Sequence, residues 1–338
     1  MSDSPLISVL LPVYKAEAWL EECLSSIQKQ TEKNFEVLAA NDGSTDHSAE
    51  ILDRFAASDP RFKISHLKYA GIIPTLTEAE TRARGKYICR MDADDRMPPR
   101  RLEIQSRFLA KVSGPTVVSG AVSYFSDGEL GEGFQKYAMW MNALHSHEDH
   151  LRELFVECVL PSPGWMMRTE DFRKIGGYLE TVYPEDYCLV FKMFAAGMRV
   201  VKSDEIVLEW RDHSGRSSRT LDVYRDQKFW PLKAEYLKVI HGTRIGDREL
   251  VIWGMGKTAK SMLEAFRKSG VLIHSLVTDN ANKIGMRYEG LPVHSPDSLD
   301  PKKYYVLVAV SARGARQEIA AKLSKMGFEE TLDYCRMV

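Results

Sequence analysis

Residues 7–40 read ISVLLPVYKAEAWLEECLSSIQKQTEKNFEVLAA. Ile7 to Val13 and Phe35 to Ala40 are apolar runs of strand length, and the apolar residues between Glu17 and Gln30 repeat at helical spacing. Two neighbouring strands joined through a helix run parallel. The stretch therefore predicts the start of an α/β domain whose mostly parallel sheet is covered by helices.

The alternation continues along the chain. A helix is expected over Ala49 to Ala57, a strand over Phe62 to Leu67, a further helix through Arg84, and a strand over Tyr87 to Met91. After Pro98-Pro99 a basic helix begins, and the later pattern predicts a short strand near Val117 and a long helix from about residue 132 to 158.

A second, smaller α/β unit is predicted at the C-terminal end. A helix around Trp230 to Gly242 closes the first unit, and Glu249 to Gly254 opens a new strand-helix-strand series. This series runs through Ile273 to Thr278 and Tyr305 to Val310. We predict two domains, 1–242 and 248–338, which agrees with the length of 338 residues.

Composition excludes several classes of function. The chain has 46 basic and 47 acidic residues, a balance that does not favour nucleic acid or an anionic membrane. No apolar run approaches the roughly 18 to 20 residues that cross a bilayer, so membrane contact is expected to be peripheral at most. The N-terminus does not read as a signal peptide, and the five cysteines contain no C-x-x-C pair. We expect a soluble cytoplasmic protein.

Polar clusters follow three of the predicted strands. They are Pro12 to Tyr14, Asn41 to Ser44, and Asp92 to Asp95. Ligands of an open parallel sheet bind beyond the carboxyl ends of its strands. Grouped carboxylates repel one another, and a Mg²⁺ or Mn²⁺ ion that bridges two phosphates would relieve that repulsion. Alternatively, these aspartates cap the next helix or pair with Arg96, Arg100 and Arg101.

Four ordered stretches resemble the family 2 glycosyltransferases of the GT-A fold. They are residues 7–14 (ISVLLPVY), 40–46 (ANDGSTD), 83–95 (ARGKYICRMDADD) and 99–103 (PRRLE). The resemblance continues through 176–178 (GGY), 184–187 (PEDY) and 210–219 (WRDHSGRSSR), so it covers about residues 5–240. It implies a metal-dependent transfer of sugar from a nucleotide-diphosphate sugar to a glycan or lipid-linked acceptor, in the synthesis of bacterial surface glycans or polysaccharides. A UDP-sugar is the first candidate donor.

The resemblance also implies roles for individual residues. The divalent metal is assigned to Asp94 and His213, and the catalytic base to Asp186. The residues assigned to the nucleotide-sugar are Pro12, Tyr14, Asp42, Arg84, Asp92 and Glu185.

These roles are chemically consistent with a single displacement. A carboxylate on the face opposite the leaving phosphate can take the proton of the acceptor hydroxyl, which implies inversion at the anomeric carbon. A bound cation stabilises the charge that the leaving diphosphate gains. Alternatively, Glu185-Asp186 cap the helix that follows, and His213 is a solvated loop residue.

Three further features leave alternatives open. Trp165 is expected either to stack on the acceptor sugar or to belong to the core. Arg216 and Arg219 clamp the diphosphate or form surface ion pairs. Cys188 stands where an acidic residue is expected, and Tyr69-Ala70-Gly71 lacks an expected asparagine, so donor specificity is in question. A non-catalytic nucleotide-sugar-binding regulatory protein is the alternative function.

The second unit carries a dinucleotide fingerprint. Gly254 and Gly256 begin a G-x-G-x-x-A pattern after a strand, and Asp279 ends the next strand. Glycines of this pattern allow phosphate to approach a helix N-terminus, and the aspartate binds ribose hydroxyls. Because only about 90 residues remain, we expect a small Rossmann-like module for docking or nucleotide sensing, with an oxidoreductase as the alternative.

Overall fold

The computed structural model describes residues 4–126, 132–178, 182–213, 215, 226–312 and 314–338. The chain forms two compact units. The first consists of Met1–His147, Val159–Thr181 and Glu185–Thr220, and the second of Glu148–Cys158, Val182–Pro184 and Leu221–Val338. The second unit therefore contains more than its predicted range, and the division into 1–242 and 248–338 stays a prediction.

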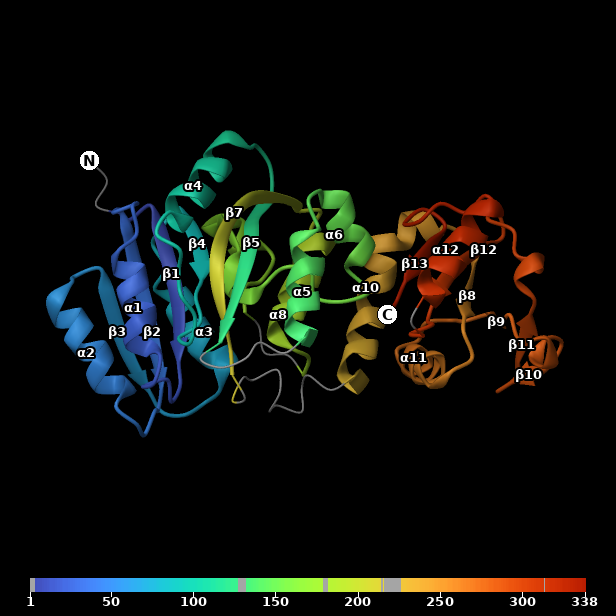
Figure 1. Cartoon of the computed structure of the whole chain (residues 1–338), viewed down its shortest axis with the longest axis horizontal. Coiled ribbons are helices and arrows are strands. Elements are labelled where there is room, and N and C mark those ends of the chain that lie inside the picture. The colour runs from blue at the N-terminus through green and yellow to red at the C-terminus, as the bar shows by residue number, and fades with distance from the viewer. Residues whose placement is uncertain (1–3, 127–131, 179–181, 214, 216–225, 313) are drawn as a thin grey trace. The chain divides into compact units, whose positions relative to one another are not determined.

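The first unit is built on a seven-stranded sheet. Its strand order is β3-β2-β1-β4-β6-β5-β7 (Figure 1). The parallel part consists of β1 (Ile7–Val13), β2 (Phe35–Asp42), β3 (Phe62–Leu67) and β4 (Tyr87–Arg90). All four strands lie where the hydrophobic pattern predicts them. Their parallel pairing brings the polar clusters after β1, β2 and β4 to one edge of the sheet.

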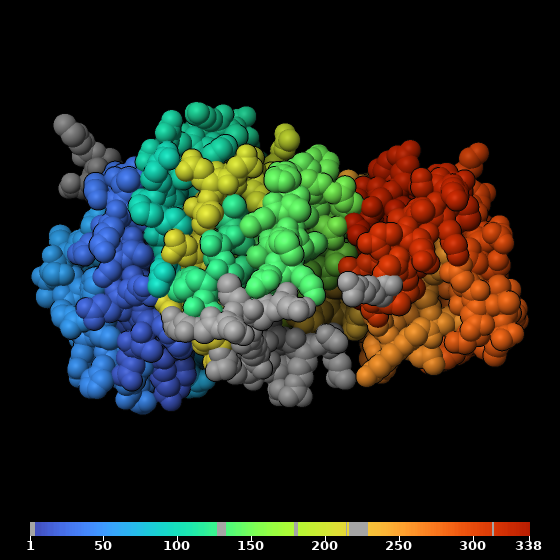
Figure 2. All heavy atoms as spheres, in the orientation of Figure 1, coloured from blue at the N-terminus to red at the C-terminus, as the bar shows by residue number. Residues whose placement is uncertain are grey.

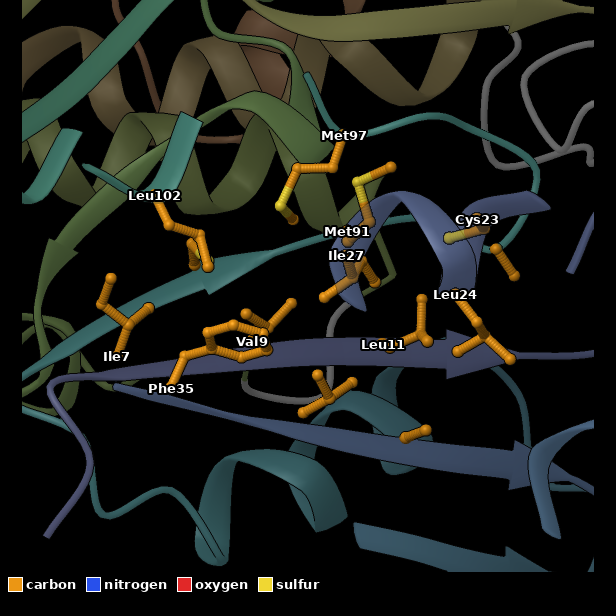
Figure 3. Packing of buried hydrophobic residues seen from close by; sticks show 14 of the residues in the cluster. Ile7, Val9, Leu11, Cys23, Leu24, Ile27, Phe35, Met91, Met97 and Leu102 are labelled. Atoms are coloured by element: carbon orange, nitrogen blue, oxygen red, sulfur yellow. The ribbon is translucent and has the colours of Figure 1, made fainter. Parts of the chain in front are cut away.

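Helices cover this parallel part and bury its apolar side chains. They are α1 (Leu20–Gln28), α2 (Ser48–Ser58), α3 (Ile72–Thr81) and α4 (Arg101–Lys111). Figure 3 shows alternate residues of β1, such as Val9 and Leu11, packed against Leu24 and Ile27 of α1. Alternation along a strand sends every second side chain to the same face, so one face of β1 contributes a continuous part of the core.

The other half of the sheet departs from a parallel arrangement. It consists of β5 (Thr116–Ser126), β6 (Met166–Arg168) and β7 (Arg199–Asp212). The short β6 pairs antiparallel with both β4 and β5, whereas β5 and β7 run parallel. The remaining elements of this region are η1 (Ser162–Gly164), α7 (Thr169–Lys174) and α8 (Glu185–Ala195).

The long helix predicted over residues 132 to 158 is wrong. The structure has α5 (Glu132–Asn142) and a separate α6 (His147–Glu153). Asn142 explains the break, because its side chain donates to the Val122 carbonyl (2.8 Å) and accepts from the Val122 amide (2.9 Å). These two bonds fix the end of α5 on β5, and in Figure 2 the residues of α5 (green) form part of the surface of this unit.

The second unit contains a six-stranded sheet of order β10-β11-β9-β8-β12-β13. The strands are β8 (Glu249–Trp253), β9 (Ser275–Val277), β10 (Arg287–Tyr288), β11 (Leu291–His294), β12 (Tyr304–Val308) and β13 (Tyr334–Arg336). The helical elements are α10 (Asp226–Ile245), α11 (Lys257–Lys268), η3 (Ala281–Lys283), η4 (Pro296–Ser298) and α12 (Ala315–Lys325). The predicted second strand-helix-strand series is confirmed, since β8, β9 and β12 pair in parallel.

Among the helices in the described part of the chain, none combines the length and the apolar character that a membrane span requires.

The first prediction concerns the close approach of Gly85 to β1. A Cβ atom on residue 85 would lie 2.5 Å from the Ser8 nitrogen and 2.8 Å from the Tyr87 oxygen, both of them backbone atoms. We expect Gly85→Ala to lower the free energy of unfolding by about 1–3 kcal/mol in urea denaturation. The control is Gly133→Ala in α5, where a Cβ meets no atom within 4 Å. Equal effects of the two substitutions would contradict the prediction.

The second prediction concerns pH and the buried His241 of α10. Burial, together with Arg244, lowers the pKa of His241 to about 4, and its Nδ1 is hydrogen-bonded to the Tyr305 hydroxyl (3.2 Å). The imidazole of His241 takes up a proton near pH 6.5 in the unfolded chain but only near pH 4 in the folded chain. The contribution of His241 to the free energy of unfolding is therefore fully present above pH 6.5 and is lost as the pH falls toward 4. The loss amounts to about 3 kcal/mol.

Urea unfolding at a series of pH values measures this loss. His241→Gln should flatten the pH dependence relative to the wild type. An unaltered slope in His241→Gln would disprove the assignment.

Candidate functional site

A buried arginine contacts the loop that follows β4. This loop, Asp92 to Asp95, is called the acidic loop below. Arg90 is 5% exposed, and its Nε donates to Asp92 Oδ1 at 2.7 Å. Its Nη1 donates to Glu185 Oε1 at 3.1 Å, and Glu185 lies in the first turn of α8. One guanidinium therefore joins two residues that the sequence assigns to the donor. Arg90 was not predicted as a site residue, although an arginine inside an apolar strand that ends in aspartates is a usable signal.

The positive charge of Arg90 and the negative charges of Asp92 and Glu185 offset each other in this buried position. Burial raises the pKa of the Asp92 carboxyl, the guanidinium of Arg90 opposes that rise, and the nearby carboxylate of Asp94 adds to it. Burial disfavours the charged form of Arg90, yet its pKa is raised because the carboxylates of Asp92 and Glu185 surround it. The carboxylates of Asp92 and Asp94 repel each other, and a divalent cation at Asp94 would relieve that repulsion.

The two predicted metal ligands lie together. His213 Nε2 is 2.8 Å from Asp94 Oδ2, although the two residues are 119 positions apart. His213 directly follows β7, and its ring lies tilted against that of Trp19 with 4.1 Å between centroids. Trp19 precedes α1 and was not predicted as a site residue.

The donor atoms of this pair suit a small divalent cation. Mg²⁺ is commonly held by one or two carboxylates, with substrate phosphates and water completing its shell, and Mn²⁺ accepts imidazole nitrogen as well. Within the residues that the structure describes, no group of three or more His, Cys, Asp or Glu side chains forms a complete metal site. Binding of a metal by Asp94 and His213 stays a prediction.

Asp95 fastens the acidic loop to β7. Its Oδ1 accepts from the backbone amide of Arg211 (2.8 Å), and Arg211 Nε donates to the Asp94 carbonyl (2.8 Å). Arg96 and Glu209 also exchange backbone hydrogen bonds of 3.0 and 3.1 Å. The carboxylate of Asp95 thus has a structural partner, and β7 is held where it delivers His213 to Asp94.

Asp42 shapes the other wall of the site. It is 4% exposed, and its two carboxylate oxygens accept from the backbone amides of Ala70 (2.7 Å) and Gly71 (2.9 Å). The same loop carries Tyr69, whose ring lies 5.0 Å from that of the exposed Tyr14. Pro12 is buried inside β1. Asp42 and Tyr14 therefore lie at the same edge of the sheet as the acidic loop, as predicted from the strand ends.

Asp186 lies beside Glu185 in the first turn of α8, and its Oδ1 accepts from the Tyr187 amide at 2.7 Å. This contact agrees with the helix-capping alternative, and it leaves the base assignment a prediction. Because Glu185 is bonded to Arg90, the first turn of α8 is held beside the end of β4. The arrangement puts Asp186 and the acidic loop on the same side of the sheet.

Arg84 lies apart from the other residues assigned to the donor, and its assignment stays a prediction. Its backbone amide donates to Glu36 Oε1 (2.9 Å), and its guanidinium lies 3.5 Å from Glu36 Oε2. Glu36 is the second residue of β2, and Arg84 precedes β4, so both lie at the amino edge of the sheet. The acidic loop is at the opposite edge.

Trp165 belongs to the core. Its side chain is 1% exposed and stacks on Phe172 with 5.6 Å between centroids, so neither face is available to a sugar. Its burial supports the alternative in which Trp165 is part of the core. Arg216 and Arg219 lie outside the described residues.

The fingerprint of the second unit has structural explanations of its own. Gly254 has φ 141°, and a Cβ there would lie 2.9 Å from the Ala309 carbonyl oxygen. Gly256 precedes α11 in an extended conformation. Asp279 accepts from Trp253 Nε1 (3.2 Å) and forms an ion pair with Lys322. Ligand binding by Gly254, Gly256 and Asp279 stays a prediction.

The third prediction tests the double acceptor role of Asp42. We expect Asp42→Asn to lower the free energy of unfolding by about 1–3 kcal/mol, because the amide keeps one acceptor oxygen for two N–H donors and loses the charge that strengthens both bonds. Urea denaturation measures the change. Asp204→Asn is the control, since that side chain is 96% exposed. A destabilisation no larger than that of the control would show that the two bonds are replaceable.

Comparison with known proteins adds independent findings. Residues 8–176, half of the chain, match the family model described as glycosyl transferase family 2. Residues 246–332 match a model described as C2185-like, N-terminal. A glycosyltransferase of Haemophilus influenzae is 28% identical over 241 residues, which cover 70% of this chain and 74% of that protein. The glycosyltransferase GlyG of Streptococcus pneumoniae is 34% identical over 129 residues, covering 38% of this chain and 43% of that protein.

A solved structure shows the same fold. TarS of S. aureus, residues 1–349 in complex with UDP-GlcNAc, is similar with a TM-score of 0.55 and 19% sequence identity. The similarity covers 78% of this chain and 71% of that chain. The predicted GT-A fold is confirmed.

Proposed function

The chain belongs to glycosyltransferase family 2, and from this membership we propose that it transfers a sugar from a nucleotide-diphosphate sugar to an acceptor hydroxyl, with inversion at the anomeric carbon. One observation carries the proposal. The His213 imidazole and the Asp94 carboxylate meet at 2.8 Å, at the sheet edge that also holds Asp92 and Glu185. This is the edge at which ligands of parallel sheets bind.

The residues of the site divide the work between them. Pro12, Tyr14 and Asp42 form the wall that receives the nucleoside, and Asp92 with Glu185 contacts the sugar. Asp186 takes the proton from the acceptor hydroxyl as that oxygen attacks the anomeric carbon. Attack from the face opposite the leaving phosphate inverts the configuration.

Asp94 and His213 are the residues that would hold a divalent metal. When bound there, Mg²⁺ or Mn²⁺ would supply positive charge to the leaving diphosphate. The fit rests on the donor atoms of these two side chains and on the repulsion between the neighbouring carboxylates of Asp92 and Asp94.

Donor and acceptor belong to the proposal as well. TarS was solved with UDP-GlcNAc, which supports a UDP-sugar as the first donor to test. We propose a glycan or lipid-linked acceptor, a cytoplasmic location, and a role in bacterial surface glycan or polysaccharide synthesis. The Haemophilus and Streptococcus relatives support a bacterial glycosyltransferase.

The fourth prediction separates nucleotide binding from transfer. We expect UDP to raise the melting temperature of the wild type more in Mn²⁺ than without metal, since a ligand that binds the native state stabilises it. Asp94→Ala should abolish the metal-dependent part. Asp186→Asn should keep the UDP response and lose about 10²–10⁴-fold in kcat, the usual contribution of a general base. GDP, dTDP and CDP in the same panel identify the base.

Asp204→Asn is the matched control, because it removes an exposed carboxylate from β7. Full activity in Asp186→Asn would contradict the assignment of the base. A wild type that binds UDP but neither transfers nor hydrolyses any UDP-sugar would support the non-catalytic regulatory alternative.

A further inference from the structure

Arg90 places a charged side chain in a buried strand, where its desolvation is unfavourable. All four residues of β4 are buried, and its neighbours Ile88 and Cys89 are fully enclosed. A guanidinium in such a place loses its hydration, and burial of a charge is tolerated when it is paired and hydrogen-bonded. An apolar residue would complete the strand at no such cost. The arginine therefore has a task that packing alone does not explain.

The two partners of Arg90 define that task. Nε donates to Asp92 in the loop after β4, and Nη1 donates to Glu185 in α8, 95 residues further along the chain. The guanidinium is planar, and its donors are fixed relative to one another. The guanidinium therefore fixes the distance and the orientation between the carboxylates of Asp92 and Glu185.

Arg101 shows what a purely structural buried arginine does in the same region. It is fully buried, and it donates to the backbone carbonyl of Arg90 (2.9 Å) and to the side-chain oxygen of Gln105 (3.0 Å). These acceptors belong to the core of the domain. Arg90 instead contacts the carboxylates of two residues assigned to the donor site.

We propose that Arg90 is a positioning residue for sugar transfer. It fixes the first turn of α8, and with it Asp186, at a set distance from the loop that carries Asp92 and Asp94. Arg90 acts through Glu185, and the proposal rests on the proposed transferase function and its assignment of Asp186.

Removing the guanidinium should change catalysis more than nucleotide binding. Without it, Asp92 and Glu185 repel each other, and the first turn of α8 loses its contact with the end of β4. The wall formed by Asp42 and Tyr14 involves neither residue. A misplacement of about 1 Å at a reacting group can cost about 100-fold in rate. We therefore expect kcat to fall by about 100-fold in Arg90→Met, with the affinity for UDP unchanged.

The fifth prediction is a double-mutant cycle on the full chain. Arg90→Met, Glu185→Gln and the double variant are compared with the wild type for kcat, for donor KM, and for UDP affinity by calorimetry. If Arg90 acts through Glu185, the double variant loses no more kcat than the more affected single variant. Additive losses in kcat would overturn the proposal. A raised donor KM and weaker UDP binding in Arg90→Met, with kcat unchanged, would also overturn it.

Two further measurements keep the test decisive. Arg168→Met is the matched control, because Arg168 lies in the adjacent strand β6 and donates to the carbonyls of Gly114 (2.7 Å) and Leu109 (2.9 Å). It pairs with Tyr87 at the opposite end of β4, so its replacement should lower the melting temperature and leave kcat unchanged. If Arg90→Met does not fold, Arg90→Lys serves instead. Lysine keeps the positive charge but lacks the planar set of donors that contacts Asp92 and Glu185 together, so kcat should still fall.

Hydrogen exchange separates this inference from the function on which it rests. In Arg90→Met, amides of the first turn of α8 should exchange faster than in the wild type, while those of α1 keep their rate. This readout does not require turnover. A wild type that transfers no sugar would remove the transferase proposal, and unchanged exchange in α8 would by itself overturn the positioning role.

Discussion

Carboxylates that gather at one edge of a sheet must be offset by positive charge, and much of the first unit serves that requirement. Arg90 lies between Asp92 and Glu185, and the imidazole of His213 lies against Asp94. Each of these contacts ties a distant element to the end of β4. Charge compensation therefore also positions the elements, since α8 and β7 reach the edge through the groups that neutralise it.

The parallel core of the fold was readable because its signals are local. The runs that become β1, β2 and β4 are fully buried, so their apolar stretches match the strands closely. The three-residue β6 gives no such signal, and its antiparallel place between β4 and β5 depends on tertiary pairing. The break after α5 depends on Asn142 finding Val122, a contact 20 residues away that periodicity does not reveal.

The same distinction applies to the site. Residues at strand ends, such as Asp42 and Asp94, were located by topology alone. Arg84 belongs to the same sequence motif as Asp92 and Asp94 but precedes β4, which puts it at the amino edge of the sheet and away from them. Arg90 was overlooked because its significance comes from Glu185, 95 residues away. In the second unit, Gly254 is required by the nearby Ala309 carbonyl, so a ligand fingerprint and a packing requirement coincide at that glycine.

The sequence separation of Asp94 and His213 has a consequence for folding. The bonds of Asp42 end at Gly71, whereas the pair of Asp94 and His213 is complete only when residue 213 has joined the sheet through β7. Closing a longer loop costs more conformational entropy before the contact is gained, so the pair of Asp94 and His213 carries a larger loop-closure cost than the bonds of Asp42. A chain in which β7 has not yet joined the sheet would contain the segments that bond to Asp42 but would lack the Asp94–His213 pair.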